Sequence, residues 1–314
     1  MDGLTSLEIC AGAGGQALGL EQAGFVHEAV VELDPDACET LRLNRGAAWK
    51  IIEGDIHDQD GCGFSGIDLL AGGIPCPPFS IAGKQLGAGD ERDLFPSALR
   101  LVREARPRAV LLENVRGLAA PRFDGYRMQV LTCLRVLGYQ TWWRQIQASE
   151  HEVPQLRPRF VLVAIRRPWS ARFGWPDPSP RRPPTVGDSL RDLMASGGWP
   201  GADAWAARAC GIAPTIVGGS KKHGGPDLGP TRARQAWAAL GVDGLGVADH
   251  PPAPDFPPRQ PPKLTVAMVS RLQGFPDGWC FSGRKTAAYR QVGNAFPPPV
   301  ARALGTAVRQ ALEG

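Results

Sequence analysis

Short apolar segments alternate with amphipathic segments along the first half of the chain. The apolar segments predict β-strands at residues 6–11, 26–33, 49–54, 67–72, 109–115, 139–147 and 160–165. Apolar residues recur at helical spacing at 16–23, 36–44, 94–105 and 126–137. Near-continuous apolar strands such as Ala109-Val110-Leu111-Leu112 are typical of a sheet buried on both faces. The pattern therefore predicts an α/β fold with a doubly wound, mostly parallel sheet, which binds its ligands at the carboxyl ends of the strands.

Composition changes near residue 168 and again near residue 263. Between 168 and 262 lie 17 of the 30 prolines and five of the nine tryptophans, so we expect short, turn-rich elements with tryptophans in the core. Helical spacing returns at 265–272 and 299–312. The sequence thus predicts a large domain at 1–167, a smaller irregular domain at 168–286, and a segment at 287–314 that returns to the large domain.

The overall composition excludes several classes of protein. A chain of 314 residues with 43% hydrophobic residues can bury a full core, which excludes a disordered protein. Seven cysteines without a Cys-x-x-Cys pair argue against a disulfide framework and a zinc site, so we expect no metal and a cytoplasmic location. No apolar run approaches the roughly 18–20 residues that span a bilayer. The formal charge of +4 permits a polyanionic partner without requiring one.

A glycine-rich loop follows the first predicted strand. Residues 12–17, Gly-Ala-Gly-Gly-Gln-Ala, allow a tight turn and leave the N–H groups at the next helix start open to an electron-rich ligand. Glu32 ends the second strand, where its carboxylate can accept hydrogen bonds from ribose hydroxyls, and Asp55 follows the third, where it can bind an adenine amino group. The alternative is a plain turn with solvated acids, but three strand ends in register favour a nucleoside cofactor.

A cysteine and a glutamate follow the next two strands. Prolines flank Cys76, fix the backbone around it and place the thiol on a stiff loop, as suits a nucleophile. Glu113 ends the fifth strand beside it, where a protonated carboxyl group could donate to a ring nitrogen. The alternatives are a small buried cysteine and a helix-capping acid.

Three further polar residues precede the strand at 160–165. Strand alternation places Gln155, Arg157 and Arg159 on one side, and guanidinium groups beside a cysteine and a glutamate suit a ring carbonyl or a phosphate. An NAD-dependent oxidoreductase would use the glycine loop and Glu32 but would leave these groups without a joint purpose.

Taken in order, these segments resemble the bacterial DNA (cytosine-5)-methyltransferase family. Pro75-Cys76 is similar to the nucleophile dipeptide of the family, residues 113–115 to its catalytic acid segment, and residues 291–295 to its closing cofactor segment. The resemblance covers nearly the whole chain apart from the middle domain. It implies the S-adenosylmethionine-dependent methyltransferase fold, with a catalytic and cofactor-binding domain at 1–167 and a target-recognition domain at 168–286.

The resemblance also implies a reaction, in which a methyl group passes from S-adenosylmethionine to C5 of a cytosine. Cys76 would add to C6 of the ring and Glu113 would engage N3 and the exocyclic amine. Arg159 would hold O2, with Arg157 and Gln155 in support. A base within a duplex is out of reach of such an attack, so the cytosine must be flipped out of the helix.

The cofactor site that the resemblance implies contains Cys10, Ala11, Gly12, Gly14, Gly15, Glu32, Leu33, Asp55, Ile56, Pro75, Leu94, Asn294 and Phe296. Three positions depart from the family pattern. Cys10 stands where a phenylalanine is common, Pro77 where a glutamine is usual, and Phe296 where a smaller aliphatic residue is usual. None of these departures removes a catalytic group.

Two segments are expected to contact DNA. The first, at 80–92, is rich in small residues and offers Ser80, Lys84 and Arg92 to phosphates. In the second, Thr215 belongs to a dipeptide that resembles the Thr-Leu pair of target-recognition domains. Hydrogen-bond donors follow on a glycine-flanked loop, namely Ser220, Lys221, Lys222 and His223. The alternatives are an ordinary surface loop and a solvated turn.

The expected partner is double-stranded DNA, bound by a monomer. The alternatives for its context are a solitary enzyme and a member of a restriction-modification system with a separately acting endonuclease. Two alternatives share the fold. A catalytically silent DNA-binding relative is disfavoured by the intact set of Cys76, Glu113 and Arg159. An RNA methyltransferase is disfavoured by the long middle domain.

Overall fold

The computed structural model describes residues 3–74, 93–219 and 225–314. The chain forms two compact units. The first, here the sheet unit, comprises Met1–Ile146, Pro158–Asp177 and Ala301–Gly314. The second, the helical unit, comprises Gln147–Arg157 and Pro178–Val300. Each is described below by itself.

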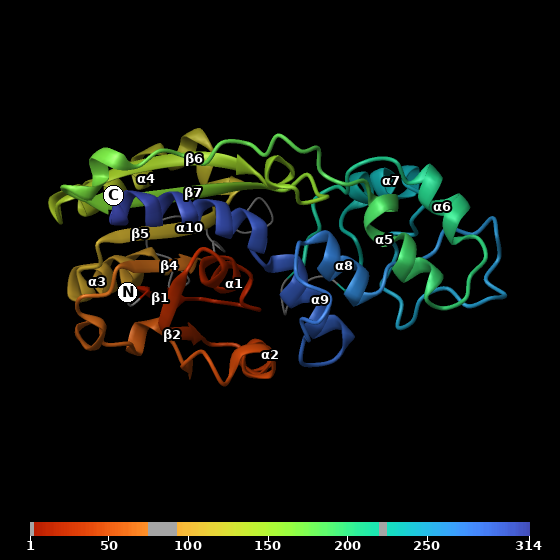
Figure 1. The fold of residues 1–314 in the computed structure, drawn as a ribbon, viewed down its shortest axis with the longest axis horizontal. Helices are drawn as coiled ribbons and strands as arrows, with labels where there is room; N and C mark the ends of the chain where they lie inside the picture. The colour runs from red at the N-terminus through yellow and green to blue at the C-terminus, as the bar shows by residue number, and fades with distance from the viewer. Residues whose placement is uncertain (1–2, 75–92, 220–224) are drawn as a thin grey trace. The chain divides into compact units, whose positions relative to one another are not determined.

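A seven-stranded sheet forms the centre of the sheet unit in the described part of the chain, in the order β3-β2-β1-β4-β5-β7-β6 (Figure 1). Its strands are β1 (Leu4–Ile9), β2 (Phe25–Glu32), β3 (Ile51–Glu53), β4 (Leu69–Gly73), β5 (Ala109–Val115), β6 (Tyr139–Gln147) and β7 (Pro158–Arg166). The neighbouring pairs from β3 to β5 are parallel, whereas β7 runs antiparallel to β5. The predicted doubly wound, mostly parallel sheet is confirmed.

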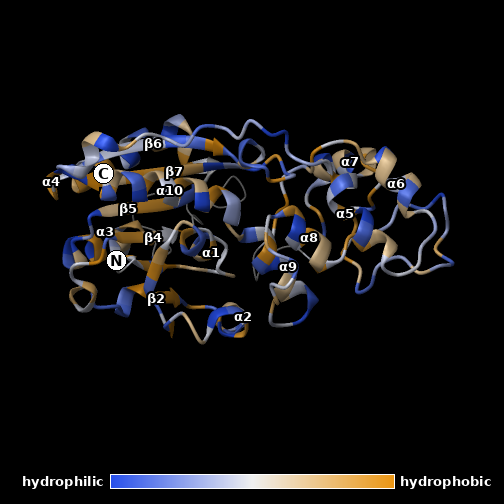
Figure 2. Ribbon diagram, in the orientation of Figure 1, coloured by the Kyte–Doolittle hydropathy of each residue, from blue (hydrophilic) through white to orange (hydrophobic). Residues whose placement is uncertain are grey.

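Helices cover both faces of this sheet. They are α1 (Gly15–Gln22), α2 (Pro35–Arg45), α3 (Phe95–Ala105), α4 (Asp124–Val136) and α10 (Pro298–Glu313). Leu7 and Ile9 of β1 join α3 and α4 in one hydrophobic cluster. On the opposite face α10 lies against α1, so close that a Cβ on Gly305 would stand 2.9 Å from Leu20 Cδ2 (Figure 1). Hydrophobic colour accordingly concentrates in the strands, which are buried on both sides (Figure 2).

The helical unit is built from short helices joined by proline-rich turns. They are α5 (Val186–Ala195), α6 (Ala202–Arg208), α7 (Thr231–Ala239), α8 (Val266–Leu272) and α9 (Lys285–Asn294). Its core includes Trp199, Trp205 and Trp237, so the expectation that tryptophans form the core holds for these three. Thr185 caps α5 by accepting a hydrogen bond from the Asp188 N–H while the Asp188 carboxylate binds back, so the helix starts abruptly after a proline-rich stretch.

The bounds of the two units differ from the predicted domain bounds. Residues 147–157 and 287–300 belong to the helical unit, and residues 168–177 belong to the sheet unit. Helix α10 begins in the helical unit and continues into the sheet unit after Val300. The assignment of catalysis to one part and target recognition to the other stays a prediction. Among the described helices, none has the length and apolar character of a membrane span.

Candidate active site

The turn after β1 lies at the carboxyl edge of the sheet and leads into the N-terminus of α1. Gly12 and Gly14 have φ of 55° and 83°, in the left-handed region that glycine adopts most easily. Gly14 is the N-cap of α1 and supplies no capping side chain, so the first N–H groups of the helix are available to a ligand. A Cβ on Gly12 would have no neighbour within 4 Å among the residues that the structure describes, so these residues leave space above the loop. This cradle fits the electron-rich part of a nucleoside cofactor.

Glu32 braces this loop from the end of β2. One carboxylate oxygen accepts a hydrogen bond from the Gly12 N–H at 2.7 Å, and the other accepts one from the Asp34 N–H at 2.8 Å. Burial raises the pKa of Glu32, while these backbone donors act in the opposite direction. Because a carboxylate offers about four acceptor positions, each oxygen retains a position for a ribose hydroxyl.

Asp55 lies after the neighbouring strand β3. Its Oδ1 accepts a hydrogen bond from the His57 N–H at 2.9 Å and lies 2.7 Å from His57 Nδ1. Both contacts lower the pKa of Asp55, and the hydrogen bond from the backbone N–H has the larger effect. Both contacts use Oδ1, and among the described residues none donates to Oδ2, which leaves that oxygen for an adenine amino group. His57 was not predicted, although its position two residues after Asp55 is a signal for such a turn.

Other predicted cofactor residues differ in exposure. Leu33 is 61% exposed at the end of β2, whereas Ile56 is buried. Burial is the main cause of a raised pKa at Cys10, and the neighbouring carboxylate of Glu32 adds to it, so this thiol is neutral. Ala11 is buried and Gly15 begins α1.

Glu113 and Arg159 face each other across β5 and β7. Arg159 Nε lies 2.7 Å from Glu113 Oε1, and the two side chains are 12% and 10% exposed. Burial lowers the pKa of Arg159, and the charge of Glu113 opposes this shift. Gly73 pairs with Glu113 in the sheet register, and a Cβ on Gly73 would approach Glu113 Oε2 to 3.4 Å. The small residue therefore leaves room beside the carboxylate.

The end of β4 is anchored by the residues around this pair. The Ile74 N–H donates to the Glu113 carbonyl at 3.1 Å, and Asn114 Nδ2 donates to the Ile74 carbonyl at 3.1 Å. Ile74 is the last described residue before the segment that holds the predicted nucleophile. The predicted site residues in that segment, Pro75, Cys76, Ser80, Lys84 and Arg92, lie outside the described residues.

Hydrogen bonds of Asp93 fix the chain at the start of the next described segment. Asp93 is buried, accepts a hydrogen bond from the Phe95 N–H at 3.1 Å, and accepts another from the Tyr126 hydroxyl at 2.5 Å. Leu94, a predicted cofactor residue, is the N-cap of α3. Sequence reasoning missed Asp93 and Tyr126, because their pairing depends on how α3 packs against α4.

Arg157 belongs to the helical unit, where it is completely buried. Its guanidinium donates to the carbonyls of Ile216 at 2.7 Å, Gly293 at 2.8 Å and Ala295 at 2.9 Å. These acceptors come from two separate segments of the chain. One fully buried cation therefore fastens the stretch around Thr215 to the end of α9.

Gln155 extends the same network. Its Oε1 accepts a hydrogen bond from the Ile216 N–H at 3.0 Å, and its Nε2 donates to Gln273 Oε1 at 2.5 Å. Gln273 in turn donates to the carbonyls of Val292 and Ala295 at 2.8 and 3.1 Å. The prediction of one common side for Gln155, Arg157 and Arg159 is thus only partly met, since Arg159 belongs to the sheet unit. Gln273 was missed; it is the C-cap of α8 and directly follows the helix predicted at 265–272.

The remaining predicted residues of the helical unit lie on either side of this network. Thr215 Oγ1 donates to the Leu156 carbonyl at 2.5 Å, and Asn294 Nδ2 donates to the Gly219 carbonyl at 3.3 Å. Phe296 is buried. The predicted donors Ser220, Lys221, Lys222 and His223 lie outside the described residues.

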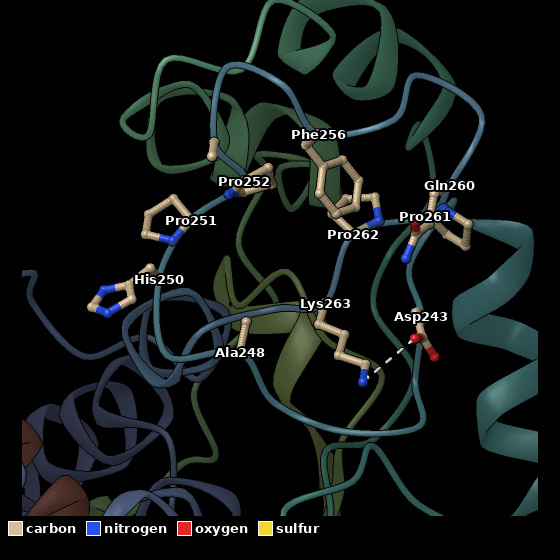
Figure 3. A pocket seen from close by; sticks show the side chains of 11 residues that line it. Asp243, Ala248, His250, Pro251, Pro252, Phe256, Gln260, Pro261, Pro262 and Lys263 are labelled. Atoms are coloured by element: carbon tan, nitrogen blue, oxygen red, sulfur yellow. Dashed lines mark ion pairs between the residues drawn. The ribbon is translucent and has the colours of Figure 1, made fainter.

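A surface pocket of the helical unit contains none of the predicted site residues (Figure 3). It is lined by prolines together with His250, Phe256 and an ion pair between Lys263 and Asp243 at 3.8 Å. In the parts of the chain that the structure describes, no three histidine, cysteine or acidic side chains cluster as metal ligands would.

Comparison with known proteins identifies a matching protein family. The sequence matches the family described as C-5 cytosine-specific DNA methylase over residues 4–210 and 229–310. Type II methyltransferase M.NaeI of Lentzea aerocolonigenes is 59% identical over 316 residues, which cover 99% of this chain and 76% of that protein. Type II methyltransferase M.NgoMIV of Neisseria gonorrhoeae is 51% identical over 312 residues, or 98% of each chain.

Two solved structures share the fold at low sequence identity. The Dnmt2 methyltransferase of S. pombe superposes with a TM-score of 0.66 at 17% identity and covers 99% of this chain and 100% of that one. The methyltransferase EhMeth of Entamoeba histolytica gives 0.69 at 13% identity and covers 100% of both chains.

Proposed function

This chain belongs to the C-5 cytosine-specific DNA methylase family, and we propose that it methylates a flipped-out cytosine in a specific duplex site, with S-adenosylmethionine as the methyl donor and Cys76 as the nucleophile. The family match and the two close relatives establish the general activity: the protein is a DNA (cytosine-5)-methyltransferase. The prediction from sequence is confirmed at this level, and the oxidoreductase alternative is excluded.

The observation that carries the proposed mechanism is the Glu113–Arg159 pair beside the anchored end of β4. Cys76 follows Ile74 by two residues in the sequence, so the proposed nucleophile comes directly after the anchored end of β4. Glu113 and Arg159 belong to β5 and β7, and β4 is the other neighbour of β5 in the sheet. A pyrimidine that is activated for alkylation needs a nucleophile at C6, a proton donor at N3 and a hydrogen-bond donor at O2. The thiol, the acid and the cation match these three needs.

The residues at the other strand ends fit S-adenosylmethionine. When bound, this cofactor supplies an electrophilic methyl group. Glu32 would accept hydrogen bonds from the ribose hydroxyls, Asp55 would accept one from the adenine amino group, and the N–H groups at the start of α1 would hold the anionic end. Asn294 and Phe296 belong to the helical unit, and their assignment to this cofactor rests on the family resemblance alone. The neutral thiol of Cys10 would give a smaller apolar contact to the adenine than an aromatic ring gives.

The chemistry assigned to each residue follows from the weak nucleophilicity of cytosine C5. The Cys76 thiolate adds to C6, which pushes electron density into the ring. Glu113 would take up a proton as its pairing with Arg159 opens, would donate that proton to N3 as charge develops there, and would accept a hydrogen bond from the exocyclic amine, while Arg159 would donate to O2. C5 would then take the methyl group as the sulfonium of the donor leaves as a neutral thioether. Loss of the C5 proton to a base, expulsion of the Cys76 thiolate and return of the N3 proton to Glu113 would restore the aromatic ring.

Arg159 and Glu113 are paired with each other in this structure, so entry of the base exchanges one ion pair for contacts with the ring. Arg157 and Gln155 support this reaction indirectly. Their polar atoms are committed to Ile216, Gly293 and Gln273, so we assign them to holding chain segments rather than to contact with the base.

We assign DNA contacts to Ser80, Lys84, Arg92, Thr215, Ser220, Lys221, Lys222 and His223. Thr215 is the described member of this set, and the Gln155–Ile216 hydrogen bond fixes the chain beside it. We further propose a monomeric enzyme that acts in the cytoplasm on nucleoid DNA. Its relatives carry Type II names, which supports a separately acting restriction endonuclease as its counterpart.

The test is methylation of unmethylated genomic DNA, read by bisulfite sequencing. Incubation with S-adenosylmethionine should protect one recurrent cytosine. Cys76→Ala should abolish this protection and leave cofactor binding within about two-fold of wild type. The matched control is Cys62→Ala, because Cys62 is an exposed cysteine of the same sheet unit and should be fully active. Turnover in Cys76→Ala would contradict the nucleophile, and transfer of labelled methyl groups to tRNA instead of duplex DNA would contradict the substrate.

A further inference from the structure

Arginines gather at the amino edge of the sheet, where the parallel strands begin. Residues 103–108 and 166–172 together contain six arginines and one acidic residue, Glu104. The first segment leads into β5 and the second leaves the antiparallel strand β7, so both lie at this edge. The Arg166 N–H donates to the Arg108 carbonyl at 3.0 Å, which holds the two segments side by side. Two separate runs of positive charge therefore meet at one place.

Three of these arginines, Arg106, Arg166 and Arg167, form what we call the arginine cluster. Tyr139 lies beside it, and its hydroxyl donates to the Pro107 carbonyl at 2.6 Å. Burial raises the pKa of Tyr139, and the charges of Arg166 and Arg106 oppose this shift, so both guanidinium groups lie near this hydroxyl. Arg167 follows directly in the sequence and is exposed.

The acidic groups at this edge are bound to other arginines. Asp68 lies 2.6 Å from Arg108, and Glu104 lies 2.9 Å from Arg100. The Arg108 guanidinium also stacks on Trp169, 4.4 Å from the ring centre. Among the residues that the structure describes, no acidic group pairs with the arginine cluster. Its like charges repel one another, and a bound polyanion would remove that repulsion.

The backbone at Arg106 points the same way. Arg106 is the C-cap of α3 and has φ of 50°, in the left-handed region where glycine is usual at the end of a helix. A residue with a Cβ is strained in this conformation, and the Arg106 side chain is exposed. An exposed cation at a position where glycine folds more easily indicates a role for the guanidinium beyond folding.

The cluster lies at the opposite edge of the sheet from the candidate catalytic pair. Glu113 comes five positions after Arg108 along β5, which is roughly 17 Å at the rise of a strand. A phosphate that binds the cluster therefore belongs to a different part of the DNA from the base that meets Glu113.

We propose that the arginine cluster binds the phosphates of a segment of duplex DNA outside the target site. Guanidinium groups match phosphate oxygens with paired hydrogen bonds, and such contacts carry no sequence information. The occupant is DNA because the family acts on this polyanion, so it is present wherever the enzyme works. The contact holds the enzyme on long DNA between target sites. The inference rests on the DNA methyltransferase activity and on none of the residues assigned to catalysis.

Two double variants with the same net charge test the cluster. Arg106→Gln/Arg167→Gln removes two exposed charges of the cluster, and glutamine keeps a Cβ, so the backbone strain at residue 106 is the same. The matched control is Lys50→Gln/Arg144→Gln. Both of these residues are exposed in the sheet unit, lie outside the cluster, and form no ion pair with an acidic group among the described residues.

Fluorescence anisotropy would measure binding to two labelled duplexes over about 50–200 mM salt. The first duplex is long and lacks the target sequence, and the second is short and covers only the target site identified by sequencing. Each phosphate contact contributes about 0.9 to the slope of log affinity against log salt, so the cluster variant should lower the slope for the long duplex by about 2. The slope for the short duplex, and methyl transfer to it, should not change. The control variant should keep both wild-type slopes.

Three results would overturn the proposal. The first is an unchanged slope for the long duplex in the cluster variant, and the second is an equal fall in the control variant, which would show a general effect of charge. The third is an equal fall on the short duplex, which would place the cluster in contact with the target site. Methyl transfer to the short duplex by wild type tests the proposed function separately, because the cluster takes no part in it.

Vesicles of an anionic phospholipid test the other polyanion of a cell. Loss of vesicle binding in the cluster variant with an unchanged DNA slope would assign the cluster to a membrane and overturn the proposal. Arg167→Glu serves if the double variant does not fold, because this exposed side chain tolerates substitution. It should weaken binding to the long duplex more than Arg167→Gln does, since glutamate repels phosphates, and equal affinities of the two single variants would contradict the contact.

Discussion

Replacement of Arg157 by methionine is expected to destabilise the protein rather than to remove a catalytic group. Methionine keeps most of the buried volume but cannot donate to the carbonyls of Ile216, Gly293 and Ala295. Ala295 retains its hydrogen bond from Gln273 Nε2 at 3.1 Å, whereas the other two carbonyls lose the arginine donor. Because each buried acceptor left without a donor costs about 1–3 kcal/mol, the free energy of unfolding should fall by about 2–6 kcal/mol.

Urea denaturation of the full chain, followed by circular dichroism, measures this loss. Arg271→Met is the matched control in the same unit. Arg271 binds Asp192 and Asp277, whose side chains are 67% and 65% exposed, and such pairs contribute about 0.2–1 kcal/mol each. Methyl transfer by Arg157→Met, measured per folded molecule, should stay within about ten-fold of wild type. A variant of wild-type stability that binds DNA and cofactor but transfers no methyl group would refute the reasoning and return Arg157 to contact with the base.

Three further changes test the buried and catalytic groups. Glu113→Gln should lower the single-turnover rate of methyl transfer by about 10²–10⁴-fold, the usual contribution of general acid catalysis, with cofactor affinity unchanged; an unaltered rate would dismiss this acid. Burial raises the pKa of Glu8 well above 4.5, so the native state favours the neutral acid and loses stability as pH rises above 4.5. The stability advantage of Glu8→Gln in urea denaturation should therefore grow from pH 4.5 to 8, and an advantage independent of pH would count against a neutral Glu8. Burial lowers the pKa of His27 below 6.5, so the free energy of unfolding falls as pH decreases through 6.5. Between pH 6.5 and 5, His27→Gln should lose less of this free energy than wild type in the same assay. Parallel plots of stability against pH for the two proteins would contradict this.

Much of the sheet unit could be predicted from sequence because its segments carry long, regular patterns. Both β5 and β6 have the predicted bounds, and the other strands differ by a few residues at their ends. The helices of the helical unit were harder to predict from the sequence. Helices α5, α6 and α7 have only 10, 7 and 9 residues, and the turn-rich composition around them hides their periodicity. Such short helices gain their stability from packing around the tryptophan core rather than from intrinsic propensity.

The sequence by itself determined which chemical groups stand at the ends of successive strands. Gly12, Glu32, Asp55 and Glu113 could be placed at one edge, because parallel strands present all their carboxyl ends there. Only the tertiary structure decided how those groups are paired. The alternation of side chains along a strand predicted that Arg157 and Arg159 lie on one side. In the structure Arg157 donates to carbonyls 59 and 136 residues away in the sequence, whereas Arg159 pairs with Glu113. Local periodicity depends on residues that are close in the sequence. The partners of these two arginines come together only when distant segments pack, so no short-range sequence pattern predicts them.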